Sequence, residues 1–193
     1  MLTLALLVSI GIHFMTQRLK NSRLQLFIAV TTYILLHLLI QHFTSGVPSH
    51  YLLQDSSMPL ISNWWGALIL PVLTWSMCTL LNRKHGSVYP RQVWIKMASA
   101  GIYALAMSAL FYAGYVELLS IIILPSILVL ALFFPIYGPA YVLGYVLVSS
   151  VGFGAVIPLM ASLIFAVIGF IVYRGVRPAL LYVLVSVKAL TKP

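Results

Sequence analysis

Long apolar segments are the feature that most limits how this chain can fold. Residues 97–134 form one apolar stretch that only Glu117 interrupts, and residues 140–173 form another. As single helices, at 1.5 Å per residue, they would be about 57 Å and about 51 Å long, whereas the hydrocarbon core of a bilayer is roughly 30 Å thick. Each stretch is therefore predicted to fold back on itself as a hairpin.

The composition supports a membrane protein. Apolar residues make up 62% of the 193 residues and charged residues 7%, against roughly 25% charged in an average soluble domain. The sequence predicts an all-α polytopic bundle, one integral domain in contact with the lipid bilayer, with about seven (six to seven) transmembrane helices. The predicted spans are residues 1–16, 24–43, 63–81, 97–115, 118–134, 139–156 and 158–173, followed by an interfacial tail at 179–193.

The N-terminal run is predicted to be a span rather than a signal peptide. Residues 1–16 lack a basic segment before the apolar run, and the positive charge follows the run instead. No small-residue cleavage site comes after it. This run is short for a span, but as a first helix it places the N-terminus outside.

The net charge of +9 is distributed in a way that predicts topology and not binding to nucleic acid. Basic residues cluster close to the ends of the apolar runs, where Lys and Arg mark the cytoplasmic side. With the predicted spans, all eleven Lys and Arg residues fall on one side, and Asp55 and Glu117 fall on the other. We therefore expect a multi-pass protein of an inner or plasma membrane, with its N-terminus outside and its C-terminus in the cytoplasm.

Turn residues support this division. Residues 135–139, Pro-Ile-Tyr-Gly-Pro, predict a compact internal turn, and Glu117 marks a tight external turn within the 97–134 stretch. Gly152, Gly154 and Pro158 mark the fold-back of the 140–173 stretch. That hairpin is predicted either to cross fully or to dip in and out as two half-helices.

Polar and aromatic residues gather at the predicted outer side, and these are the candidate ligand-binding residues. His37 lies at membrane depth, where an ionisable group should face protein or water, and Gln41 follows it by one helical turn. Polar loops and interfacial Trp residues are also ordinary in membrane proteins, so the set has a second interpretation without a ligand. The predicted binding residues are His37, Gln41, Asp55, Trp64, Trp65 and Glu117; His42, His50 and Asn63 lie near them in the sequence.

The sequence does not favour metal or enzyme chemistry. His13 and His37 are expected roughly 15 Å apart along the membrane normal, and His37 and His42 do not have the i, i+4 spacing of a ligand pair. Cys78, the single cysteine, excludes an intramolecular disulfide. No HExxH, G-x-S-x-G or phosphate-binding glycine loop occurs, so we assign no cofactor and do not expect an enzyme.

Small residues at helical spacing predict close helix packing. Ala100, Ala104 and Ser108 recur every four residues in one predicted span. A looser stripe in another span consists of Ala140, Gly144 and Gly152. Such stripes let helix backbones approach in lipid, either within one chain or between subunits.

Two functions are compatible with these features. One is a transport-associated membrane protein that binds a small solute at its external face, because polar and aromatic residues gather at its outer side and prolines and glycines break the third, fifth and sixth to seventh predicted spans. The alternative is a non-catalytic structural or accessory subunit that packs against other membrane subunits, because the loops are short and the small-residue stripes are prominent.

Overall fold

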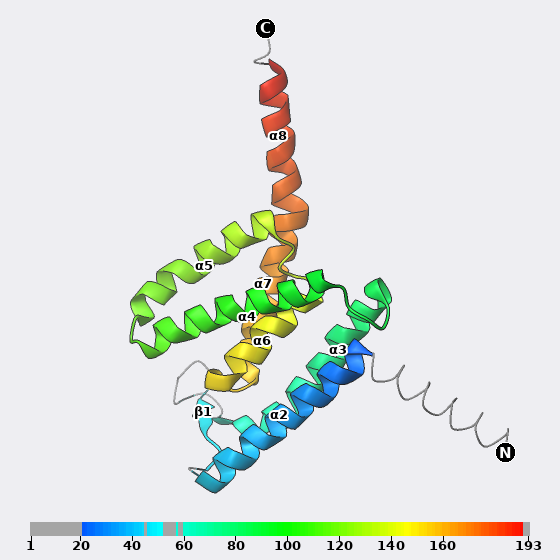
Figure 1. The fold of residues 1–193 in the computed structure, drawn as a ribbon. Coiled ribbons are helices and arrows are strands. Elements are labelled where there is room, and N and C mark those ends of the chain that lie inside the picture. The colour runs from blue at the N-terminus through cyan, green and yellow to red at the C-terminus, as the bar shows by residue number, and fades with distance from the viewer. Residues whose placement is uncertain (1–20, 45, 52–56, 58–59, 191–193) are drawn as a thin grey trace, which may run out of the picture. The chain divides into compact units, whose positions relative to one another are not determined.

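The computed structural model describes residues 21–44, 46–51, 57 and 60–190 of the chain, and it confirms the all-α fold class (Figure 1). Its internal contacts divide the chain into two compact units, Met1–Ile95 and Lys96–Pro193, which we name unit 1 and unit 2. Both units contain long apolar helices. The single integral domain expected from the sequence stays a prediction.

Five helices of the described chain are long and apolar enough to cross a membrane. They are Ser22–Thr44, Asn63–His85, Arg91–Tyr112, Val116–Phe133 and Val156–Val183. Helix α6 (Pro139–Phe153) has 15 residues, so it is about 22 Å long and shorter than the hydrocarbon thickness. The predicted span at residues 1–16 lies outside the described residues, and the count of seven spans stays a prediction.

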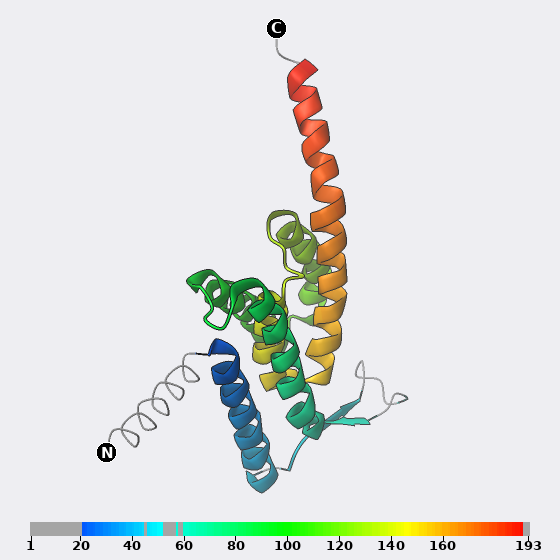
Figure 2. The same cartoon turned by 90° about the vertical axis from the view of Figure 1, so that its right-hand side faces the viewer.

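Unit 1 is built on two antiparallel helices, α2 (Ser22–Thr44) and α3 (Gly66–His85), which lie side by side in both views (Figures 1 and 2). Helix α2 buries Val30, Ile34 and Leu38, which are four residues apart and so lie on one face. Helix α3 contributes its own buried positions: Leu70, Leu73, Thr74, Cys78 and Leu81. α3 continues through Pro71, which removes one backbone donor from the helix.

A short β-hairpin connects these helices, which the sequence did not predict. Strands β1 (Ser49–Tyr51) and β2 (Leu60–Ser62) pair antiparallel, with His50 opposite Ile61. The 3-10 turn η2 (Asn63–Trp65) then leads into α3, and the Asn63 N–H donates to the Pro48 carbonyl at 3.1 Å. The pairing holds the two ends of the connection together beside the end of α2 and the start of α3.

Unit 2 contains the fold-back predicted for residues 97–134. Helix α4 (Arg91–Tyr112, which starts in unit 1) ends at a turn, and α5 (Val116–Phe133) begins four residues later. Gly114 occupies the turn with φ of +85°, a conformation that glycine adopts without steric cost. Glu117 lies in the first turn of α5. The hairpin is confirmed, and its turning residue is Gly114.

The second fold-back lies between α6 and α7 (Val156–Ile171), at Gly154 with φ of +69°. Before it, the Gly138 N–H donates to the Pro135 carbonyl at 2.9 Å, and Pro139 opens α6 at a position where its missing N–H costs nothing. The compact turn predicted at residues 135–139 is therefore present between α5 and α6.

Helix α7 continues into the tail without a break. It passes through the π-helical segment η3 (Val172–Val176) into α8 (Arg177–Leu190), as the straight run in Figures 1 and 2 shows. Pro178 has no N–H to donate to the Arg174 carbonyl, and the Arg177 N–H instead donates five residues back to Val172. The tail is thus one helix with the last predicted span, and its placement on the membrane surface stays a prediction.

Candidate functional site

The candidate site begins with a polar stripe on one flank of α2. Tyr33, His37 and Gln41 are spaced by four residues and so follow one another along the helix. The Tyr33 ring stacks on the His37 ring, with centroids 5.8 Å apart and planes 17° apart. His37 and Gln41 are half-buried beside the positions that face α3. The stripe therefore places hydrogen-bonding groups within a predicted membrane span.

The side chains of His37 and Gln41 form a direct pair. The two Nε2 atoms are 3.0 Å apart, so the Gln41 amide donates to a His37 ring whose own proton is on Nδ1. The Gln41 Oε1 atom is buried and has no hydrogen-bond partner among the described residues. A buried acceptor without a partner costs about 1–3 kcal/mol unless water, a ligand or another protein satisfies it.

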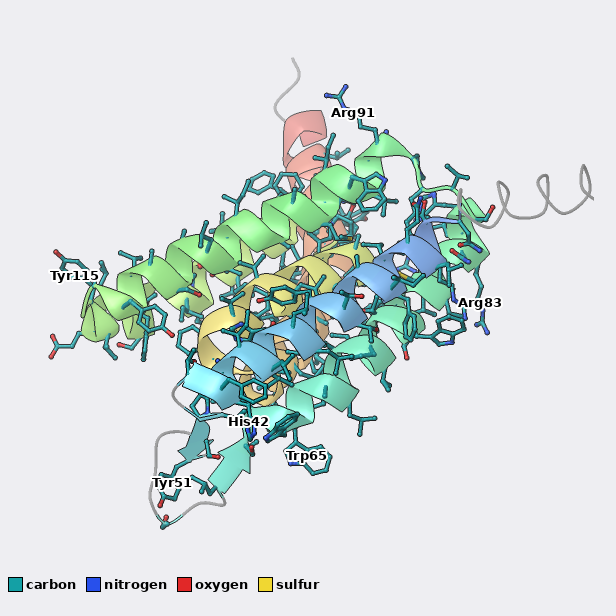
Figure 3. The ribbon with its side chains drawn as sticks, turned by 60° about the horizontal axis from the view of Figure 1, so that its bottom comes forward. His42, Tyr51, Trp65, Arg83, Arg91 and Tyr115 are labelled. Carbon is teal, nitrogen blue, oxygen red and sulfur yellow. The ribbon has the colours of Figure 1, made fainter. Side chains whose placement is uncertain are left out.

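Trp64 and Trp65 lie where unit 1 turns from the β-hairpin into α3. The Ser62 hydroxyl accepts a hydrogen bond from the Trp64 N–H at 3.4 Å, which caps the 3-10 turn. Both indoles are about half-exposed, and His42 approaches Trp64 edge-on with centroids 6.2 Å apart. Figure 3 shows His42 and Trp65 at this same end of the helical pair. The structure thus brings the His37–Gln41 pair, His42 and the two indoles to one end of unit 1.

The two acidic residues of the predicted set do not join this group. Asp55 lies outside the described residues. Glu117 is exposed and belongs to unit 2, where the Ser120 hydroxyl donates to its backbone carbonyl at 2.7 Å. No group of three or more His, Cys, Asp or Glu side chains that could hold a metal occurs among the residues that the structure describes.

The small residues predicted for packing are placed as follows. Gly144 lies against the backbone of Met97, and the carbonyl of Gly152 accepts a hydrogen bond from the Tyr112 hydroxyl at 2.9 Å, so both face α4 within unit 2. Ala104 is buried. The other two members of the first stripe, Ala100 and Ser108, are half-buried.

Sequence reasoning missed a hydrogen-bonded cluster at the opposite, basic end of unit 1. Tyr89, 4% exposed, donates its hydroxyl proton to the Cys78 carbonyl at 3.0 Å and accepts from the Asn82 amide at 2.6 Å. Its backbone N–H donates to the Ser22 hydroxyl at 3.1 Å. These contacts join residues up to 67 positions apart. The short polar loop after α3 was the only sequence signal near them.

Helices of this length and apolarity define a multi-pass α-helical membrane protein. Comparisons with protein families, with curated proteins and with solved structures give no match to this chain. Function must therefore be argued from the residues themselves.

Proposed function

We propose that this chain is a transport-associated protein of an inner or plasma membrane that binds a small polar solute at its external face. The observation that carries the proposal is the His37–Gln41 pair, whose buried Gln41 Oε1 has no partner among the described residues. Polar groups within a span that lack a partner are typical of sites that a ligand or a second protein completes. Trp64 stands at the same end and supplies an aromatic surface.

The chemistry of this end favours a neutral solute. With the Gln41 amide nitrogen donating, the pair offers a donor at His37 Nδ1 and an acceptor at Gln41 Oε1. The His37–Gln41 amide–imidazole contact and the two indoles carry no negative charge. Trp64 and Trp65 offer ring faces for an apolar side of the solute. A molecule with hydroxyl or amide groups beside an apolar face matches this set.

Gln41→Leu gives the sharpest test of solute binding. Gln41→Leu removes the unpartnered Oε1 and also the hydrogen bond to the half-buried His37 ring, so the midpoint without solute should fall by the equivalent of about 1 kcal/mol. A solute at 100 times its dissociation constant stabilises the wild type by about 2.7 kcal/mol, measured as a shift of the thermal midpoint in detergent. We expect Gln41→Leu to lose the solute-dependent shift, measured against its own slightly lower midpoint without solute.

The aromatic part of the site is tested separately. Trp64→Ala combined with Trp65→Ala should abolish the shift, whereas Trp94→Ala, which removes a similarly exposed indole from the start of α4, should leave it intact. A broad panel of neutral solutes that shifts no midpoint would falsify the proposal. So would a shift that survives both the Gln41 and the double Trp substitutions.

A second candidate, a non-catalytic accessory subunit, is favoured by the exposure of the spans. In the most apolar 18-residue stretch of each of the helices α2, α4 and α5, 17% of the residues are buried within this chain. Lipid or partner helices must cover the rest. Gentle extraction followed by native mass spectrometry should then find the chain in a defined complex, and a monomer without partners would count against this candidate.

A further inference from the structure

The basic end of unit 1 carries a cation, Arg23, that has no carboxylate partner among the residues that the structure describes. The Arg23 guanidinium lies over the Trp75 ring, with Cζ 3.4 Å from the ring centroid, within the range of a cation–π contact. Its Nε atom is buried and has no hydrogen-bond partner among the described residues. The full sequence contains two acidic residues, Asp55 and Glu117, and neither lies in the described part of unit 1.

Three further features fix Arg23 and add positive charge around it. The Ser22 N–H donates to the Ser87 carbonyl at 2.8 Å, so the start of α2 is tied to the loop that follows α3. Phe27, one turn along α2, packs edge-on against Trp75 with centroids 5.3 Å apart. The last turn of α3 carries Arg83, Lys84 and His85, and Figure 3 shows Arg83 at the end where α2 begins. The guanidinium is therefore held in place at a positively charged end.

An apolar ladder leads away from this cation along α3. Trp75, Val72 and Leu68 are spaced by three and four residues, so they lie on one face over about 10 Å of helix. They are 46%, 55% and 58% exposed. A fixed cation followed by an exposed apolar strip matches an amphiphile with an anionic head. A free anion would use the cation alone.

We propose that Arg23, Trp75 and the α3 ladder form a binding site for an anionic phospholipid, whose phosphate pairs with the guanidinium and whose acyl chain lies along Val72 and Leu68. The phosphate supplies acceptors that a planar guanidinium binds with two parallel N–H bonds. The ladder lies within a predicted membrane span, so the acyl chain would lie in hydrocarbon. Its contact with Val72 and Leu68 needs no polar group. This inference is independent of the proposed solute site at the other end of unit 1.

The test uses the full chain purified in neutral detergent and titrated with dioleoylphosphatidylglycerol, with bound lipid counted by native mass spectrometry. Dioleoylphosphatidylcholine and inorganic phosphate form the other two arms. Loss of one basic residue near a membrane surface weakens lipid binding about five-fold. We expect that loss for Arg23→Gln and less than a two-fold change for Arg174→Gln, which removes an equal charge from unit 2.

The ladder is tested on the same helix. Leu68→Ser should weaken binding of phosphatidylglycerol, whereas Leu80→Ser, an exposed leucine about 120° away around α3, should not. If Arg23→Gln does not elute as a folded monodisperse species, Arg23→Lys replaces it. That variant keeps the charge but loses the contact of the guanidinium with Trp75, and it should bind phosphatidylglycerol more weakly than the wild type does.

Three results would overturn the proposal. The first is equal weakening by Arg23→Gln and Arg174→Gln, which would show that net charge alone matters. The second is equal binding of phosphatidylcholine and phosphatidylglycerol. The third is displacement of the lipid by millimolar inorganic phosphate, which would identify a site for a free anion.

Discussion

Tyr89 shows how one buried side chain can hold a loop between two membrane helices. Its hydroxyl contacts the Cys78 carbonyl and the Asn82 amide, and its N–H contacts the Ser22 side chain. Burial raises the pKa of the Tyr89 hydroxyl well above its ordinary value of 10.0, because the phenolate would lose its hydration. The folded state therefore favours the neutral phenol.

Tyr89→Phe should lower the free energy of unfolding by about 1–3 kcal/mol, since it removes the hydroxyl and leaves buried partners unsatisfied. A group whose pKa is raised by folding contributes stability that is complete below the pKa of the unfolded chain and is lost above it. Wild type should thus lose stability as the pH rises above about 10, and the part due to Tyr89 should vanish in Tyr89→Phe. Thermal midpoints of both proteins from pH 7 to 11 measure the difference, and parallel curves would contradict this account.

At the scale of helices, the crossing of α4 and α6 within unit 2 depends on Gly144. A Cβ atom placed there would overlap the Met97 backbone, whose carbonyl carbon would be 2.8 Å away. At Gly101 the nearest atom would be Val148 Cγ2 at 2.9 Å, the end of a side chain that can move. The Gly144 contact is with backbone, which has less freedom to adjust.

Gly144→Ala should therefore destabilise the protein by about 1–3 kcal/mol, although alanine by itself favours a helix by up to about 1 kcal/mol. Gly175→Ala is the matched control, because a Cβ there meets nothing within 4 Å. Thermal midpoints in detergent compare the two substitutions. If both variants were equally stable, the close approach of α4 and α6 would not contribute to the fold.

The elements that could be predicted from the sequence are those that depend on the length of an apolar segment. Residues 24–43 correspond closely to α2 at Ser22–Thr44, because a bilayer requires about 20 apolar residues in a row. Helix α4 begins at Arg91, before its apolar run, because Pro90 precedes it and polar residues also form helix. The join of α7 to α8 was missed because the last span was predicted to end at residue 173, where the apolar run stops before Arg174 and Arg177, whereas a π-helical segment carries the helix past them.

The candidate site was predictable in part for a similar reason. The contact of His37 with Gln41 follows from their spacing on one helix. The contacts of Tyr89 with Ser22 and of Arg23 with Trp75 depend on how two helices pack, which no local spacing encodes.

At the scale of the whole molecule, topology is the prediction with the widest consequences. In a cysteine-free background made by Cys78→Ser, single cysteines at Ser49, Glu117, Ser87 and Thr191 can be tested with an impermeant thiol reagent on intact cells. The one-sided distribution of Lys and Arg predicts labelling of the first two positions and protection of the last two. Labelling at position 87 from outside would invert the orientation, and the proposed solute end would then face the cytoplasm.

The unbroken helix formed by α7, η3 and α8 is longer than a bilayer can hold. Its segments have 16, 5 and 14 residues, 35 in total, which corresponds to about 52 Å. To keep that whole length within roughly 30 Å of hydrocarbon, the helix would have to lean by about 55°, beyond the 0–40° seen for membrane helices. Even at a lean of 40° the helix would span about 40 Å, so about a quarter of its length has to lie outside the hydrocarbon. Tyr182, Val183 and Val185 are exposed in the C-terminal part of this helix. The membrane surface or another protein therefore has to cover these apolar side chains, which follow Arg174 and Arg177 in the sequence.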